Sequence, residues 1–151
     1  MMKKIVKLLL CFIILFTLAG CSNKKGMSAS EFEKKLNNDG YYVSDITNEN
    51  IGSKTKKVLI ANNKKYQVEY YEYKDKTSCK DAYKSNKKLF KRYKKKSSKE
   101  NETNAKDYDF YSLDLDDEYL AIARSGNTLI YTWANKEYKK DLQKLFKKLN
   151  Y

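Results

Sequence analysis

This chain of 151 residues has no histidine and no proline, and it has only three cysteines and five glycines. Without histidine, a Ser-His or Cys-His catalytic pair cannot form, and the usual zinc sites lack their nitrogen ligands. With three cysteines, the chain also has too few thiols for a disulfide framework. These absences exclude the commonest nucleophilic and zinc chemistries, so we expect a protein without a cofactor and without catalytic activity.

Long apolar runs are also absent, except near the N-terminus. Residues 8 to 19 form an apolar run of twelve that only Thr17 interrupts, which is shorter than the roughly 20 residues of a membrane-spanning helix. Lys3, Lys4 and Lys7 supply a cationic segment around its start, and Leu18-Ala19-Gly20-Cys21 follows at its end. This pattern is typical of a cleaved export signal.

The same stretch resembles the lipobox of bacterial lipoproteins, whose cysteine is lipidated on its thiol and becomes the first residue after cleavage. The resemblance implies a signal peptide at residues 1–20, a lipid on Cys21, and attachment to the outer side of the cell membrane. Residues 21–27 then form the lipidated cysteine and a short tether, of which residues 22 to 27 reach only some 20 Å when fully extended. Residues 28–151 remain as a single extracytoplasmic domain, in which Cys79 has no partner for a disulfide.

The expected mature chain is strongly basic. From Cys21 onward it carries 29 lysines and arginines against 19 acids, so its formal side-chain charge is +10. Thirty of the 32 basic residues are lysine and 13 residues are asparagine, which is the usage of an AT-rich coding sequence. Codon usage can therefore account for part of the basicity, and together with the lipobox it suggests a low-GC Gram-positive host.

Residue patterns predict an α+β fold with the order α-β-β-β-α-β-β-β-α. Helices are expected after the capping box at Ser28, after Thr77 and after Asn135, where apolar residues recur with helical spacing. Strands are expected at residues 41–46, 58–61, 66–73, 107–115, 118–124 and 129–134, with short turns between most of them. The polar segment 94–106 is expected to be a mobile loop. We expect a mostly antiparallel sheet with helices on one face, and the two similar halves admit an internal duplication.

The basic segment in the second predicted helix is the strongest candidate for a functional surface. Between Lys80 and Lys99 there are ten cations and only one acid, Asp81. The predicted polyanion-binding residues are Lys80, Lys84, Lys87, Lys88, Lys91, Arg92, Lys94, Lys95 and Lys96. Like charges one helical turn apart repel each other by a few tenths of a kcal/mol, a cost that an external polyanion would offset.

Two interpretations of these lysines remain open. They can be solvating residues on the wet side of a helix, or they can contact anionic lipid headgroups or teichoic acids outside the cell. Nucleic acid is not expected as a partner, because export removes it and the sequence has no recognised nucleic-acid-binding pattern.

Three other features have weaker functional interpretations. Tyr71 and Tyr73 alternate onto the polar face of their strand, where they either stack on a partner or lie under a helix. The acidic turn at Asp114, Asp116, Asp117 and Glu118 either binds a partner or balances nearby lysines. Cys79 lies near a helix start, where the helix dipole could lower its pKa. The alternative to polyanion binding is therefore recognition of another exported protein through the sheet face or the acidic turn.

Overall fold

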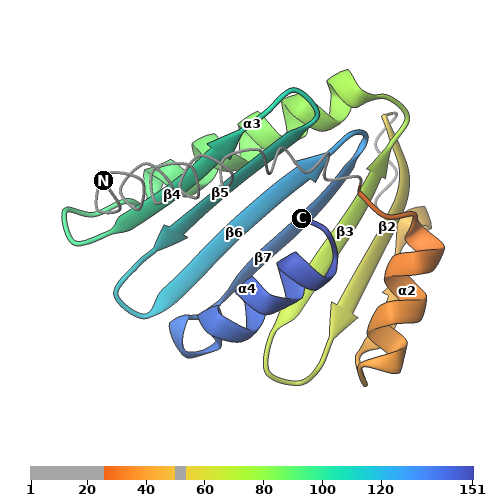
Figure 1. The fold of residues 1–151 in the computed structure, drawn as a ribbon, viewed down its shortest axis with the longest axis horizontal. Helices are drawn as coiled ribbons and strands as arrows, with labels where there is room; N and C mark the ends of the chain where they lie inside the picture. The colour runs from red at the N-terminus through yellow and green to blue at the C-terminus, as the bar shows by residue number, and fades with distance from the viewer. Residues whose placement is uncertain (1–25, 50–53) are drawn as a thin grey trace, which may run out of the picture.

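The computed structural model describes residues 26–49 and 54–151, and the predicted signal peptide, Cys21 and most of the tether lie outside the described residues. The described helices are α2 (Ala29–Asn38), α3 (Lys76–Arg92) and α4 (Lys139–Lys148), with 3-10 turns at Thr47–Glu49 and Lys136–Tyr138. The described strands are β1 (Tyr42–Asp45), β2 (Thr55–Asn62), β3 (Gln67–Tyr73), β4 (Lys99–Asn104), β5 (Tyr108–Asp114), β6 (Glu118–Ser125) and β7 (Thr128–Asn135). The predicted α+β class and the predicted order of elements are confirmed, and β4 is an additional strand (Figure 1).

The strands form one fully antiparallel sheet in the order β1-β2-β3-β7-β6-β5-β4. Hairpins join β2 to β3, β5 to β6 and β6 to β7, and the β6–β7 turn contains Gly126 in the left-handed region at φ +61°. The first three strands meet the last four where β3 pairs with β7, with Tyr70 opposite Ile130. Strands that follow one another in the chain are thus neighbours in the sheet, except β3 and β4, which lie apart because β3 pairs with β7.

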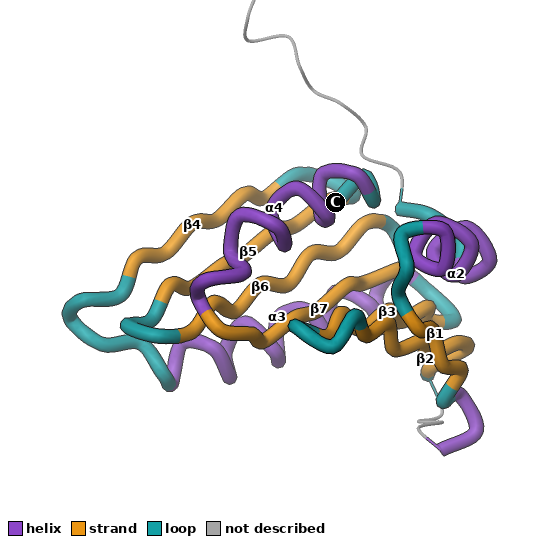
Figure 2. Tube along the Cα trace, turned by 90° about the horizontal axis from the view of Figure 1, so that it is seen from below, coloured by secondary structure: helices purple, strands orange, loops and turns teal. Residues whose placement is uncertain are grey.

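The expectation that the helices cover one face is wrong, because they lie on both faces (Figure 2). Strands β6 and β7 carry apolar residues at both odd and even positions, so both faces of the sheet need cover. Helices α2 and α4 pack on one face, and α3 packs on the other. If the two halves were duplicates, a two-fold axis perpendicular to the sheet would exchange β3 with β7 and place α3 and α4, the helices that follow them, on the same face. The two helices lie on opposite faces, so the structure does not show the symmetry of a duplicated unit.

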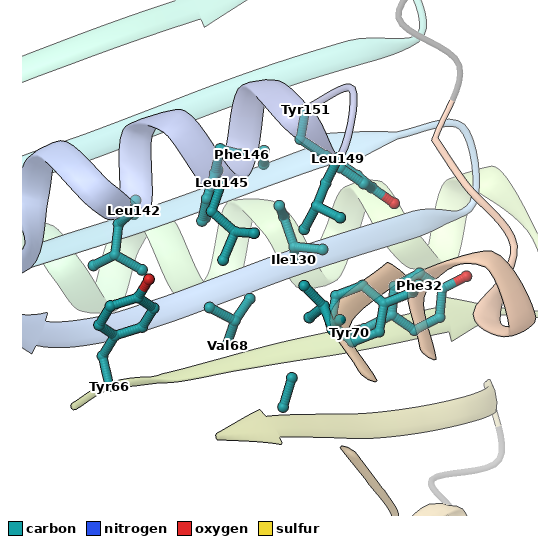
Figure 3. Close-up of a cluster of buried hydrophobic side chains, with 14 of the residues drawn as sticks. Phe32, Tyr66, Val68, Tyr70, Ile130, Leu142, Leu145, Phe146, Leu149 and Tyr151 are labelled. Atoms are coloured by element: carbon teal, nitrogen blue, oxygen red, sulfur yellow. The ribbon is translucent and has the colours of Figure 1, made fainter. Parts of the chain in front are cut away.

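The α2/α4 face holds the larger hydrophobic cluster (Figure 3). Phe32 of α2 contacts Tyr70 of β3 at a ring-centroid distance of 4.9 Å, and both side chains are fully buried. From α4, Leu142, Leu145 and Phe146 reach the same sheet face. Burial of each such side chain contributes roughly 1.5–3 kcal/mol, so this face fixes both helices firmly.

The α3 face holds a second cluster in which Phe90 is the central aromatic residue. Its ring is fully buried and lies 5.3 Å from Tyr131 and 6.4 Å from Tyr111, measured between centroids. Cys79 and Tyr83 extend the cluster toward the N-terminal end of α3. All residues of both clusters lie between Met27 and Tyr151. The experiments proposed below therefore use the chain from Ser22 to Tyr151, which contains them all.

The segment 94–106, expected to be a mobile loop, instead contains edge strand β4. All six residues of β4 are exposed, and none of them is apolar, so hydropathy could not reveal the strand. Its register is set by pairing with β5, from Lys99 opposite Asp114 to Asn104 opposite Asp109. A short, charged edge strand of this kind also resists pairing with other chains.

Two of the three predicted helix starts shift in the structure. The capping box is confirmed, with Ser28 Oγ accepting from the Glu31 amide and the Glu31 carboxylate accepting from the Ser28 amide. Helix α3 begins two residues earlier than expected, because its N-cap is Asp75 rather than Thr77. The Asp75 carboxylate accepts the Ser78 amide at 2.7 Å. Asn135 makes no side-chain cap, and a 3-10 turn precedes α4.

Candidate polyanion-binding face

The surface of α3 carries four cations at intervals of four residues, which we call the basic row: Lys80, Lys84, Lys88 and Arg92. Their spacing of four residues places neighbouring members one turn apart, and because each step turns about 40° beyond a full turn, the row runs obliquely along the helix. All four side chains are exposed. None of them forms an ion pair with any residue of 26–49 or 54–151. The row is therefore available to an external anion.

Four other predicted lysines are already paired within the protein. Lys87 binds the carboxylate of Glu102, and Lys94 binds that of Glu100. Lys91 lies 3.9 Å from Glu100, and Lys95 lies 3.3 Å from Asp116. We call these the paired lysines: Lys87, Lys91, Lys94 and Lys95. The structure thus divides the predicted binding residues into two groups, and Lys96 is a further exposed cation beyond the end of α3.

Tyr111 of β5 organises the contact between α3 and β4. Its hydroxyl donates to Glu100 at 2.7 Å, and the ammonium groups of Lys87 and Lys91 lie 5.5 and 5.7 Å from its ring centroid. The hydrogen bond from Lys94 lowers the pKa of Glu100, and that from Lys87 lowers the pKa of Glu102. Both acids are therefore ionised at neutral pH and keep Lys87, Lys91 and Lys94 against β4.

The first described residues lie on the face of the sheet opposite α3. The Gly26 amide donates to Ser125 Oγ at 2.6 Å, and the Tyr70 hydroxyl donates to the Met27 carbonyl at 3.0 Å. A side chain at Gly26 would collide with Thr128, because a Cβ there would lie 2.2 Å from Oγ1. The chain thus enters the domain beside the β6–β7 hairpin, on the α2/α4 side (Figure 2).

The acidic turn after β5 is occupied by internal contacts. Asp114 accepts from Lys139 at 2.5 Å, and Asp116 accepts from Ser97 at 3.0 Å as well as from Lys95. Glu118 accepts the indole N–H of Trp133 at 2.8 Å. The carboxylates of this turn balance nearby lysines and orient Trp133, as one of the two sequence interpretations expected.

Tyr71, Tyr73 and Trp133 of the sheet lie on the face that α3 covers in part. Tyr71 and Tyr73 are half-buried and stack at 6.3 Å between centroids, and both pack against the cluster under α3. Trp133 is half-buried below Tyr93, with 4.7 Å between ring centroids. Leu89 and Tyr93 remain exposed at 37% and 44%, so a modest apolar strip runs along the flank of α3 away from β4.

The expectation that the pKa of Cys79 is lowered is wrong. Its side chain is fully buried under α3, and this burial raises its pKa to about 12. The thiol therefore stays protonated at neutral pH and cannot act as a nucleophile.

We expect Cys79 in the folded domain to be inert toward a thiol reagent such as Ellman's reagent, and to react only after addition of denaturant. The measurement is the labelling rate of the chain from Ser22 to Tyr151 across a urea series. Rapid stoichiometric labelling in native buffer would contradict the burial of this thiol.

Several residues that shape the site were not identified from the sequence. Glu100 and Glu102 belong to the segment predicted as a loop, and only the pairing of β4 brings them under α3. Arg124 lies in a strand and is 2% exposed, with Nε donating to Asp109 at 2.7 Å. An arginine within an otherwise apolar strand was the only available signal for this buried ion pair.

No family model, curated protein or solved structure matches this chain. Across residues 26–49 and 54–151, no helix has the length and apolar character needed to cross a bilayer. The same residues contain no group of three or more cysteine or acidic side chains placed to hold a metal ion. The α3 surface is therefore interpreted from its own geometry.

Proposed function

We propose that this protein is a membrane-anchored extracytoplasmic lipoprotein whose α3 surface binds an anionic polymer of the cell envelope, without catalysis. The observation that carries the proposal is the basic row: four exposed cations, aligned along one helix, without an internal ion pair among the described residues. Repulsion within the row costs a few tenths of a kcal/mol per neighbouring pair. A polyanion lying along α3 would relieve that repulsion and gain several contacts at once.

The position of the anchor favours a wall polymer over the lipid surface. If Cys21 is lipidated, four residues separate it from Gly26, and the five Cα-to-Cα steps between them reach about 18 Å at most. That reach holds the membrane near the α2/α4 face or the β6–β7 end of the sheet, where Gly26 is bound. Helix α3 lies on the opposite face and begins at that same end, since Tyr73 pairs with Asn127.

The length of α3 places its C-terminal cations away from the anchored end of the domain. Seventeen residues at a rise of 1.5 Å give a helix about 25 Å long, so its C-terminal cations lie far from the anchored end. Most of the basic row then faces away from the membrane, into the space that teichoic acids occupy in a Gram-positive wall. The phosphates of these polymers repeat along a flexible chain, which suits a linear row of cations.

Removal of the carboxylates that pair with lysines of α3 should strengthen binding to the polymer, which gives a test of the proposal. In the double variant E100Q/E102Q, three of the paired lysines (Lys87, Lys91 and Lys94) lose their carboxylate partners, and the surface gains two positive charges. We expect tighter retention on teichoic-acid-bearing walls, by about tenfold, if each released charge contributes up to roughly 1 kcal/mol as it does at anionic membranes. Co-sedimentation at a fixed salt concentration measures the change.

The matched control is E33Q/E137Q, which adds the same charge on exposed residues outside α3 and β4. We expect this control to change retention only slightly, because charges on the far side are screened within about 8 Å at physiological salt. Equal gains in the two double variants would mean that net charge, not the α3 surface, governs retention.

The second candidate function is binding of another exported protein through the sheet face beside α3. The exposed side chains of Leu89 and Tyr93, next to Trp133, favour it. Binding of that kind would depend on Tyr93 or Tyr71 and would survive salt concentrations that release a polyanion. The salt dependence of retention therefore separates the two candidates.

A further inference from the structure

A cavity of about 490 Å³ lies between the N-terminal half of α3, the edge strand β4 and its neighbour β5. Lys80, Lys84 and Lys87 line it from the helix, and Glu102 and Asp109 line it from the strands. Two of these lysines belong to the basic row, so the cavity opens beside the surface proposed to bind the polymer. The cavity is large enough for a small ester rather than for a single ion.

The hydroxyl of Tyr83 marks this cavity as more than a surface depression. Tyr83 lines the cavity and is only 3% exposed. Its hydroxyl has no hydrogen-bond partner among the residues described. Buried polar groups without partners are uncommon in folded proteins, and each one calls for an explanation. Burial also raises the pKa of Tyr83, so the hydroxyl remains a donor at every physiological pH.

A second unpartnered donor lies behind the cavity. Arg124 is 2% exposed and uses Nε on Asp109, at 2.7 Å, and Nη1 on the Gly126 carbonyl, at 3.2 Å. Its Nη2 is buried without a partner in the described part of the chain. Arg124 does not line the cavity, whereas the Tyr83 hydroxyl does belong to a lining residue and can donate to an acceptor such as an oxyanion.

The charge balance of the cavity also suits an anion. Glu102 is paired with Lys87, and Asp109 is paired with Arg124, so the two acids of the lining are neutralised within the protein. Lys80 and Lys84 remain as cations without internal partners among the described residues. A phosphate group offers several acceptor oxygens and a negative charge, which match one hydroxyl donor and two ammonium groups.

We propose that this cavity binds a phosphate group, with Tyr83 as a buried donor and with Lys80 and Lys84 supplying the charge. The inference rests on the proposed function and names the chemical unit that the α3 surface recognises, a phosphate ester. An ester of glycerol and free inorganic phosphate share this chemistry, and the cavity volume leaves room for the polyol of the ester.

The test is a titration of the ¹⁵N-labelled chain from Ser22 to Tyr151, followed by chemical shifts, with sn-glycerol 3-phosphate, inorganic phosphate and uncharged glycerol as separate probes. We expect saturable shifts around Tyr83 with both phosphates and none with glycerol. Tighter binding of the ester would identify a polymer unit as the ligand, and tighter binding of inorganic phosphate would identify the free anion. Unsaturable shifts with all three probes would overturn the proposal.

The variant Tyr83→Phe isolates the hydroxyl. Removal of an unpartnered buried hydroxyl should leave the thermal stability unchanged or higher, whereas loss of a hydrogen bond to phosphate should weaken binding about tenfold. K84Q is a second variant that should weaken binding without reaching the core. Unchanged affinity in both variants would overturn the assignment.

The two proposals fail in different ways. K88Q/R92Q changes the basic row outside the cavity and should reduce wall retention, with the affinity for glycerol phosphate nearly unchanged. If walls retain the protein and both Y83F and K84Q bind the ester as the parent chain does, the cavity assignment fails alone. If walls do not retain the protein but Y83F still weakens ester binding, the polymer function fails alone.

Discussion

Replacing the basic row by glutamine, in the variant K80Q/K84Q/K88Q/R92Q, is expected to abolish retention on teichoic-acid-bearing walls. At roughly 1 kcal/mol for each cation near an anionic surface, four cations correspond to a loss on the order of a thousandfold in affinity. The four side chains are exposed and form no ion pair among the described residues, so the fold should be unaffected. Co-sedimentation of the chain from Ser22 to Tyr151 with walls measures the loss.

The matched control removes four cations from the opposite side of the domain: K34Q/K140Q/K144Q/K147Q. These lysines are also exposed, on α2 and α4, and they form no ion pair within the described residues. We expect the control to retain most of the binding. If both variants lose it equally, the overall charge acts rather than the α3 surface, and the proposed face is wrong.

Replacing Arg124 by methionine is expected to destabilise the fold by about 3–5 kcal/mol, because it leaves Asp109 buried without its partner. Arg124 and Asp109 are 2% and 6% exposed, and the two side chains are joined at 2.7 Å under the N-terminal half of α3. For a domain of this size, such a loss lowers the Tm by roughly 10 °C or more. Thermal unfolding followed by circular dichroism measures it.

The double variant R124M/D109L separates the buried pair from general packing. Replacement of both partners by apolar residues removes the unpaired carboxylate, so much of the lost stability should return. A Tm of R124M within about 2 °C of that of the parent chain would show that water or a rearranged partner compensates Asp109 fully. That result would also weaken the case for an unsatisfied donor near the cavity.

Much of the fold could be predicted from the sequence because local signals agreed with one another. The capping box at Ser28, the alternation of Tyr66, Val68 and Tyr70, and the Gly126 turn each specify local backbone geometry, and all three appear as expected. Strand β4 could not be predicted, since it buries no apolar side chain and exists through its pairing with β5. The apolar residues at both odd and even positions of β6 and β7 did indicate that both faces need cover, but which helix lies on which face depends on long-range packing.

The candidate site was predicted in part. Lysine spacing located the exposed face of α3, but it could not show which lysines are paired, because Glu100 and Glu102 come from a strand that the sequence did not reveal. The unpartnered donors of Tyr83 and Arg124 were equally hidden, because Tyr83 is ordinary in an amphipathic helix and the unusual position of Arg124 in an apolar strand does not show which of its nitrogens lacks a partner. Their significance appears only when β5, β6 and α3 are brought together.

The most direct measurement of the central claim is co-sedimentation of the chain from Ser22 to Tyr151 with three surfaces at about 0.15 M salt: intact Gram-positive walls, the same walls stripped of teichoic acids, and anionic phosphatidylglycerol vesicles. Screening at this ionic strength limits electrostatic contacts to about 8 Å, so only close engagement survives. Binding to intact walls, with little binding to stripped walls or vesicles, is the result expected of an α3 surface that contacts polymer phosphates. Equal binding to intact and stripped walls, or no binding to any of the three surfaces, would contradict it.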